Sequence, residues 1–246
     1  MAYAVITREL DAAAPYAAAL AALGLEALAL PVTRTVPAGD PGELARAVAS
    51  GGHAAIVVAS ARAAAALAAA RGAAALPEVW AVGPATARAL AAAGIAAQLP
   101  RGVRDARSLA GALLAERALA GRRVLVPRAE GGRDEAIALL RDAGVEVDAI
   151  VAYRTVPAAA DDPALARGLA ALRGGAAGVC AVFAPSQVAA LDALVEIRGI
   201  AAPFAAIGET TAEALRAAGA AVVAVADGPT PERLAKAVSA VYPLRS

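Results

Sequence analysis

Short loops that carry glycine and threonine recur where an apolar run meets a helical segment. One loop runs from Gly83 to Thr86, and a second runs from Gly208 to Thr210 and Thr211. Glycine permits tight backbone geometry, and a threonine hydroxyl can cap the helix that follows. The same hydroxyls and free backbone N–H groups can instead hold a carboxylate or phosphate, aided by the helix dipole. Both capping and anion binding are open interpretations of these loops.

Two further pairs of loops place hydrogen-bond donors directly after an apolar run. One pair carries serines and an arginine, and the other carries an arginine after the first apolar run of its unit. Arginine binds carboxylates through two parallel hydrogen bonds, so these loops suit a ligand with several carboxylates. The alternative is that the arginines only solvate the edge of a sheet. The candidate binding residues are Thr7, Arg8, Ser60, Arg62, Arg128, Arg133 and Ser186.

The residue inventory excludes several classes of chemistry. His53 and Cys180 are single residues of their kinds, which excludes a Cys/His metal cluster and an internal disulfide. We predict that Cys180 is a small buried hydrophobe and that His53 is a solvated loop residue. No P-loop, dinucleotide-binding or nucleophile-elbow motif occurs. These absences leave a cofactor-free enzyme or a binding protein.

Composition and charge limit the partners and the compartment. The 246 residues carry a formal net charge of +1 and only 3% aromatic residues, which makes nucleic acid a poor partner. The hydrophobic content of 60% is largely alanine, and the longest uncharged run, 174–191, contains glycines and a proline. No secretory signal is evident in the first residues. We expect a cytoplasmic protein that neither crosses nor enters a membrane.

The elements that position these loops follow from the periodicity of the chain. Short apolar runs alternate with alanine-rich segments of helical period, which predicts an α/β fold with parallel sheets flanked by helices. In such sheets ligands bind beyond the carboxyl ends of the strands, where the candidate loops lie. Strands are expected at 3–7, 26–31, 54–59, 79–82, 96–99, 123–127, 146–153, 178–183, 203–207 and 221–226, and helices at 12–23, 43–49, 61–70, 86–93, 107–119, 133–143, 186–197, 210–218 and 231–241.

The chain contains an internal duplication. Three stretches match later stretches in the same order, with offsets between 120 and 125 residues. Matches of constant order and nearly constant offset indicate a repeated unit of about 120 residues. The aligned pairs include Arg8 with Arg128, Ala55 with Val179, and Val82 with Ile207.

The sequence Arg-Thr-Val-Pro occurs at 34–37 and again at 154–157. Proline lacks an N–H donor and disfavours helix at the preceding residue, so both segments should be extended connectors. If both run between domains, domain 1 is discontinuous. Its residues are then 1–31 plus 158–246, domain 2 is 38–151, and the connectors are 32–37 and 152–157. A split into two sequential halves is the simpler alternative.

Over essentially its whole length the chain resembles the uroporphyrinogen-III synthase family. The resemblance rests, in order, on "VITR", "LVPRAEGGRDEAIALLRDAGVEVDAIVAYRTVP", "VFAPSQVAAL", "AAIGETTAEALRAAG" and "ADGPTPERLAKAV". It implies two flavodoxin-like domains joined by a two-stranded connector, with the active site in the cleft between them. It also implies closure of hydroxymethylbilane to uroporphyrinogen III, with inversion of ring D and loss of water, without metal or cofactor. We expect a monomer.

The resemblance assigns roles to particular residues. It places Tyr153 at the connector, where the phenol could assist departure of the hydroxyl group, although a buried structural tyrosine is the alternative. Ala59 and Ala184 stand where small hydroxyl residues are expected, which favours diffuse recognition by backbone groups. The competing function is a two-domain, cleft-type binding or regulatory protein without catalysis. The implied donors are Ser60, Arg62 and Thr86 from domain 2, and Ser186, Gly208, Thr210 and Thr211 from domain 1.

Overall fold

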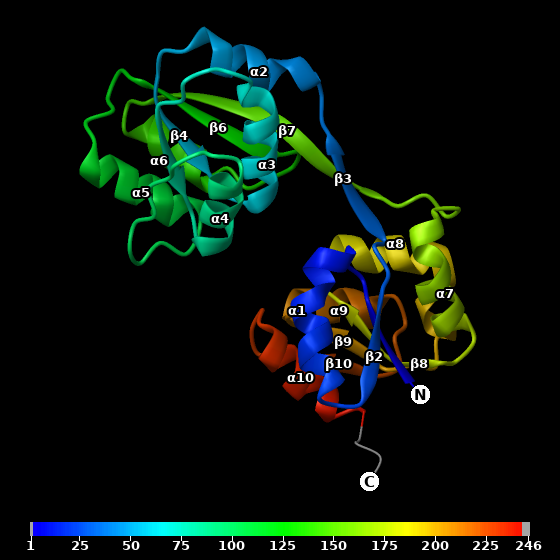
Figure 1. Ribbon diagram of the computed structural model, residues 1–246. Coiled ribbons are helices and arrows are strands. Elements are labelled where there is room, and N and C mark those ends of the chain that lie inside the picture. The colour runs from blue at the N-terminus through cyan, green and yellow to red at the C-terminus, as the bar shows by residue number, and fades with distance from the viewer. Residues whose placement is uncertain (1, 243–246) are drawn as a thin grey trace. The chain divides into compact units, whose positions relative to one another are not determined.

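The computed structural model describes residues 2–242, apart from the side chain of Pro41. The chain forms two compact units, each built on its own sheet (Figure 1). Unit 1 combines the segment up to Arg34 with the segment from Val156 onward, and unit 2 is Thr35–Thr155. None of the helices in the described part of the chain has the length and hydropathy of a membrane span.

Unit 1 contains a five-stranded parallel sheet with the order β10-β9-β8-β1-β2. Helices α1 and α10 pack on one face through one apolar cluster, and α7, α8 and α9 pack on the other face through a second. The strands are β1 (Ala2–Ile6), β2 (Leu25–Ala29), β8 (Ala177–Val182), β9 (Phe204–Ala206) and β10 (Val223–Val225). The helices are α1 (Leu10–Ala21), α7 (Ala166–Arg173), α8 (Pro185–Val195), α9 (Glu209–Ala217) and α10 (Pro231–Ser239), with short 3₁₀ turns at Pro163–Leu165 and Ile197–Gly199.

Unit 2 contains a second sheet, with the order β3-β7-β6-β4-β5. Helices α2, α3 and α4 cover one face, and α5 and α6 cover the other. The strands are β3 (Thr33–Pro37), β4 (His53–Val58), β5 (Glu78–Ala81), β6 (Arg123–Ala129) and β7 (Glu146–Pro157). The helices are α2 (Pro41–Ser50), α3 (Ala61–Arg71), α4 (Pro84–Ala92), α5 (Ala106–Glu116) and α6 (Glu135–Asp142).

The strand orders explain the duplication found in the sequence. In chain order the unit 1 strands are arranged 2-1-3-4-5, which is the flavodoxin-like arrangement. Unit 2 has the same arrangement when β6 and β7 are taken as its first two strands, followed by β4 and β5. Its predicted strand at 96–99 is reduced to a single parallel bridge between Trp80 and Gln98. The predicted α/β class with helix-flanked parallel sheets is therefore confirmed.

Strands β3 and β7 are neighbours, and each crosses from one unit to the other. The Ala158 N–H donates to the Val32 carbonyl at 2.9 Å, and the Ala38 N–H donates to the Ala152 carbonyl at 3.4 Å. Both Arg-Thr-Val-Pro segments are extended, as expected, and both strands end at the proline, which has no N–H to continue a ladder.

The single cysteine and the single histidine of the sequence are both buried. Cys180 is fully buried, as predicted, and burial raises the pKa of its thiol. The prediction of a solvated His53 is wrong: this residue begins β4, and its side chain is only 2% exposed. His53 Nε2 lies 2.8 Å from Asp148 Oδ2, which Arg123 also contacts. The carboxylate partner on β7 makes burial of the ring favourable, and no property of the local sequence shows that partner.

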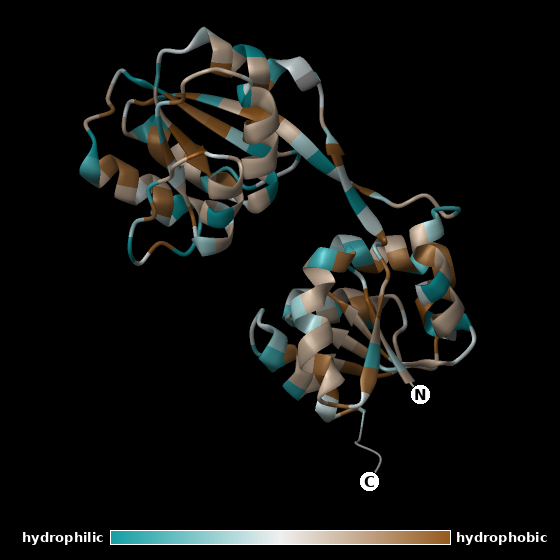
Figure 2. Cartoon of the chain, in the orientation of Figure 1, coloured by the Kyte–Doolittle hydropathy of each residue, from teal (hydrophilic) through white to brown (hydrophobic). Residues whose placement is uncertain are grey.

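Hydrophobic residues concentrate in the central strands of each unit, as the brown colouring in Figure 2 shows. Alanine, valine and leucine dominate these strands, and most of their side chains are buried. Each sheet therefore forms a rigid platform, and the loops at the carboxyl ends of its strands are held by regular elements on both sides.

Candidate functional site

A cavity of about 410 Å³ lies at the carboxyl ends of the strands of unit 2. The loops after β4 and β6, the later part of β7 and the loop before α5 contribute to its lining. The structure therefore brings together four predicted site residues, Ser60, Arg128, Arg133 and Tyr153. A parallel sheet collects such residues because the ends of all its strands meet at one edge.

Ser60 and Tyr153 form the central polar contact of this cavity. The Ser60 Oγ and the Tyr153 phenol oxygen are 2.9 Å apart. Ser60 is also the N-cap of α3, where its Oγ accepts the Ala63 N–H at 3.0 Å. Tyr153 is only 9% exposed and packs among the apolar residues beneath α2, α3 and α4. Its hydroxyl group therefore lies at a polar surface while its ring belongs to the core.

Arg128 lies near the end of β6, and the loop that follows the strand fixes its side chain. Its guanidinium pairs with Asp134 and donates to the Gly132 carbonyl. Its Nε is buried and has no hydrogen-bond partner among the described residues. Because a buried N–H without a partner is costly, an acceptor that reached this atom would be bound favourably.

Arg133 is exposed and lies close enough to Asp105 to affect its ionisation. Hydrogen bonds from the Ser108 N–H and hydroxyl hold the pKa of Asp105 below its usual value, and the positive charge of Arg133 lowers it further. Asp105 is the N-cap of α5 and forms a capping box with Ser108. Its carboxylate thus remains ionised and attracts the charge of Arg133, which lines the cavity.

Arg104 also lines the cavity, although it is not among the residues predicted from the sequence. Its backbone N–H donates to Ser108 Oγ at 3.0 Å, whereas its side chain has no hydrogen bond or ion pair within residues 2–242. An indication was present, because Arg104 follows the predicted strand at 96–99 and must lie at the carboxyl edge. The reduction of that strand to one bridge leaves a long loop that carries Arg104 into the cavity.

The structure contradicts one of the two interpretations of the glycine–threonine loops, that the threonines cap the helices. Gly83 and Gly208 are the N-caps of α4 and α9, with no side-chain capping bond, so capping by threonine is wrong. Thr86 and Thr211 lie inside the first turns and are each only 4% exposed. Neither hydroxyl has a partner in the described part of the chain. Thr210 is exposed at the same turn as Thr211.

Both N-cap glycines have extended backbones, with φ of −171° at Gly83 and 177° at Gly208. An added Cβ would meet no atom within 4 Å at either position. Neither backbone strain nor packing within the described residues therefore requires glycine. The absence of a side chain instead leaves the first-turn N–H groups open to an approaching group.

In unit 1, Thr7 holds the loop that follows β1. Thr7 is fully buried, and its hydroxyl lies 3.0 Å from the Ala181 carbonyl and 2.8 Å from Gln187 Oε1. The same amide oxygen accepts the Phe183 N–H at 2.9 Å. The predicted binding residue Thr7 is therefore enclosed, and we assign it to joining the ends of β1 and β8.

Arg8 is placed over aromatic rings at the carboxyl edge of unit 1. Its guanidinium carbon lies 4.4 Å from the Phe183 ring centroid and 5.3 Å from that of Tyr16. Stacking of this kind holds the guanidinium group of an arginine against the aromatic rings. Ser186 is exposed at the start of α8. Arg62, at the start of α3 in unit 2, is exposed and has no side-chain partner in the described segments.

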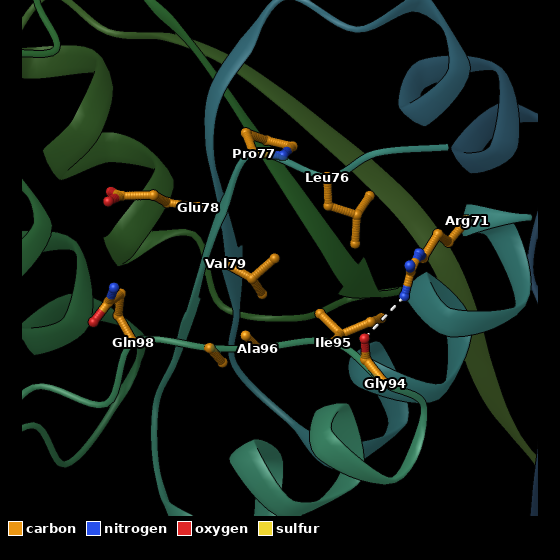
Figure 3. Close-up of a pocket in the computed structure, with 10 residues that line it drawn as sticks. Arg71, Leu76, Pro77, Glu78, Val79, Gly94, Ile95, Ala96 and Gln98 are labelled. Carbon is orange, nitrogen blue, oxygen red and sulfur yellow. Dashed lines mark hydrogen bonds between the residues drawn. The ribbon is translucent and has the colours of Figure 1, made fainter. Parts of the chain in front are cut away.

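A second cavity, of about 440 Å³, lies at the amino end of β5 and contains none of the predicted residues (Figure 3). Arg71 donates to the Gly94 carbonyl at 3.1 Å, and Glu78 and Gln98 complete its polar wall. Because ligands of open α/β sheets bind at the opposite edge, we do not assign this cavity to the site. No group of three potential metal-ligating side chains occurs in residues 2–242.

The family model described as "Uroporphyrinogen-III synthase HemD" matches residues 14–236. The chain belongs to the uroporphyrinogen-III synthase family. Members of this family are lyases that cyclise hydroxymethylbilane in tetrapyrrole biosynthesis, so the enzymatic interpretation is supported and the non-catalytic alternative is not. Among curated protein sequences, none matches this chain.

Solved structures of this family share the fold. A uroporphyrinogen III synthase variant from Thermus thermophilus is 23% identical, with a TM-score of 0.53, and the match covers 97% of each chain. The uroporphyrinogen-III synthetase of Helicobacter pylori is 15% identical, with a TM-score of 0.61, and the match covers 96% of this chain and 97% of that one.

Proposed function

We propose that this chain closes hydroxymethylbilane to uroporphyrinogen III with the unit 2 cavity as its catalytic centre and Tyr153 as its acid. The observation that carries the proposal is the placement of the Tyr153 hydroxyl in a cavity that Arg104, Arg128 and Arg133 also line. The substrate has eight carboxylates and one hydroxyl group that must leave. The cavity combines donors for carboxylates with one group that can protonate a leaving oxygen.

In this proposal Tyr153 donates its phenolic proton to the hydroxymethyl oxygen. The C–O bond breaks with its electron pair on oxygen, and water departs. The substituted α-carbon of ring D attacks the resulting carbocation and forms a spiro intermediate. The bond between this carbon and the methylene bridge to ring C then breaks, and the cation so formed on that methylene bonds to the free α-carbon of ring D, which inverts the ring. The proton lost from that carbon when the pyrrole regains aromaticity restores the phenol. The net change is the loss of one water.

The position of attack on ring D decides the product isomer, so holding the substrate in one folded conformation is the larger part of the task. Exclusion of water protects the cation. We propose that the loops at the carboxyl ends of both sheets contact the tetrapyrrole, largely through backbone N–H groups in the first turns of the helices that follow. The contributing residues are Arg62, Gly83 and Thr86 in unit 2, and Arg8, Ser186, Gly208, Thr210 and Thr211 in unit 1. Thr7 does not contact the substrate in this proposal but holds together the ends of β1 and β8, which carry the unit 1 loops.

The decisive experiment feeds enzymatically generated hydroxymethylbilane to the purified chain and determines the uroporphyrinogen isomers. We expect isomer III, whereas isomer I as the sole product would refute the proposal. Tyr153→Phe keeps the buried ring and removes the proton, and we expect kcat to fall by about 100-fold or more. An unchanged kcat in this variant would remove Tyr153 from the mechanism without affecting the isomer test.

We also propose that the chain acts in the cytoplasm as a monomer, without metal, cofactor or nucleic acid. The near-neutral charge and the single histidine and cysteine support these points. Sedimentation of the purified chain, and activity after dialysis against a chelator, test the oligomeric state and the metal requirement.

A further inference from the structure

The Ser60 hydroxyl lies between two hydrogen-bonding groups, and its protons and lone pairs can be counted. A serine hydroxyl has one proton and two lone pairs. The Ala63 N–H occupies one lone pair at 3.0 Å, so capping of α3 leaves the proton unused. The Tyr153 phenol oxygen, 2.9 Å away, is the acceptor within reach of that proton.

The duplicated copy shows that the helix does not need this hydroxyl. The offset that aligns Ala55 with Val179 also aligns Ser60 with Ala184. Ala184 is the N-cap of α8 and makes no side-chain capping bond, yet α8 is as long as α3. A helix at this place in the fold therefore forms without a hydroxyl at its N-cap.

The partner of Ser60 is also confined to one copy. The offset that aligns Arg8 with Arg128 places Thr33 opposite Tyr153. The serine and the tyrosine are thus present together in unit 2 and absent together from unit 1, as expected if the two act as a pair.

We propose that Ser60 donates its proton to the Tyr153 oxygen and thereby directs the Tyr153 proton into the cavity. This inference rests on the proposed role of Tyr153 as the acid. Ser60 is then a positioning residue for Tyr153 and not one of the substrate donors. Within residues 2–242 the Tyr153 side chain has no other hydrogen bond, so its own proton is available to the substrate.

The same arrangement assists proton transfer. When the phenol donates its proton, negative charge develops on its oxygen, and the Ser60 O–H already points at that atom. A donor that is in place before charge develops needs no reorganisation during the reaction. Ser60 would therefore act mainly on kcat and only slightly on KM.

Two substitutions separate this role from capping. Glycine is a fair N-cap, so Ser60→Gly removes the donor while weakening α3 only slightly. We expect kcat for hydroxymethylbilane to fall about tenfold with KM within about twofold, and we expect Ser60→Thr to restore most of kcat. The matched control is Thr230→Ala, which removes the side-chain cap of α10 in unit 1 and should leave kcat unchanged. A raised KM with unchanged kcat in Ser60→Gly would overturn the proposal and make Ser60 a substrate contact.

A spectroscopic measurement on the full chain without substrate tests the direction of the bond independently. The intensity ratio of the tyrosine ring doublet in the Raman spectrum distinguishes a phenol oxygen that accepts from a phenol that donates. The Tyr153 contribution is obtained by subtracting the Tyr153→Phe spectrum. We expect an accepting phenol oxygen, with loss of that signature in Ser60→Gly. A donating phenol would overturn the inference, even if Tyr153→Phe proves inactive and the proposed function holds.

Discussion

At the scale of single residues, the unit 2 cavity combines side chains held to different degrees. Arg128 is fixed by Asp134 and the Gly132 carbonyl, and Arg133 feels the charge of Asp105, whereas the Arg104 side chain has no partner among the described residues. A cation without an internal partner can pair with a ligand carboxylate without first breaking a bond. Arg104 is therefore the arginine whose removal should affect binding most directly.

Arg104→Gln should raise KM for hydroxymethylbilane by about tenfold or more with kcat nearly unchanged. A hydrogen bond to a charged group contributes about 1.5–3 kcal/mol, and about 1.4 kcal/mol is tenfold in binding. Arg101→Gln, on the same loop but outside the cavity lining, is the control for loss of charge. Equal effects of the two substitutions in steady-state kinetics would show that Arg104 acts only through net charge.

The lowered pKa of Asp148 predicts that the folded chain loses stability in acid. Although burial tends to raise the pKa of Asp148, hydrogen bonds from His53 and Arg123 outweigh this effect and hold the pKa below its usual 3.8. A lowered folded-state pKa contributes stability above the unfolded pKa, and that stability is lost as pH falls through the folded value. Asp148→Asn should therefore lower the urea midpoint at pH 7 and flatten its decline below about pH 4. An equally steep acid decline in Asp148→Asn would contradict this assignment.

At the scale of elements, helices α4 and α9 begin with the same local arrangement, once in each unit. Each helix has a glycine N-cap in extended geometry, open space beside it and a buried threonine in its first turn. A Cβ at either glycine would project into that open space. This arrangement therefore affects the access of a ligand to the helix start more than it affects folding.

Gly83→Ala and Gly208→Ala should each raise KM by about tenfold, because the methyl group obstructs approach to the first-turn N–H groups. Alanine is a poorer N-cap than glycine, so a loss of roughly 1 kcal/mol in unfolding free energy should accompany the change. Gly111→Ala, inside α5 with equally open surroundings, should instead stabilise the chain by about 0.5–1 kcal/mol with KM unchanged. An unaltered KM in both loop variants would exclude these turns from substrate binding.

At the scale of the whole molecule, each unit has its own core. The apolar clusters on the two faces of the unit 1 sheet draw all their residues from unit 1, and those of unit 2 from unit 2. The apolar core of each unit is large enough to stabilise a domain of roughly 120 residues. Folding of one unit should thus not require the core of the other.

A polypeptide of residues 35–155 should consequently fold alone. We expect cooperative urea unfolding monitored by the fluorescence of Trp80, which is fully buried in this unit. The fragment should not form isomer III, because it lacks the proposed binding residues of unit 1. A fragment without a cooperative transition would show that unit 2 depends on contacts outside its own core.

Much of the fold was predictable because it depends on local pattern. The alternation of apolar runs with helical periods indicated parallel sheets, and Pro37 and Pro157 marked the extended crossings because proline restricts its neighbours directly. The position of Ser60, Arg128 and Arg133 at one edge of a sheet was also predictable, since parallel strands bring their carboxyl ends together, whereas the position of Tyr153 at the connector was implied by the family resemblance. Helix α7 escaped prediction, as its short segment lies among glycines.

The sequence by itself determined the α/β class, the duplication and the family, because periodicity, repeated order and motif spacing are properties of the chain. Only the tertiary structure decided which polar groups meet. It paired His53 with Asp148, placed Ser60 within hydrogen-bonding distance of Tyr153, and enclosed Thr7. Partners distant in sequence meet through strand order and register, and a hydrogen bond depends on tenths of an ångström that no local pattern specifies.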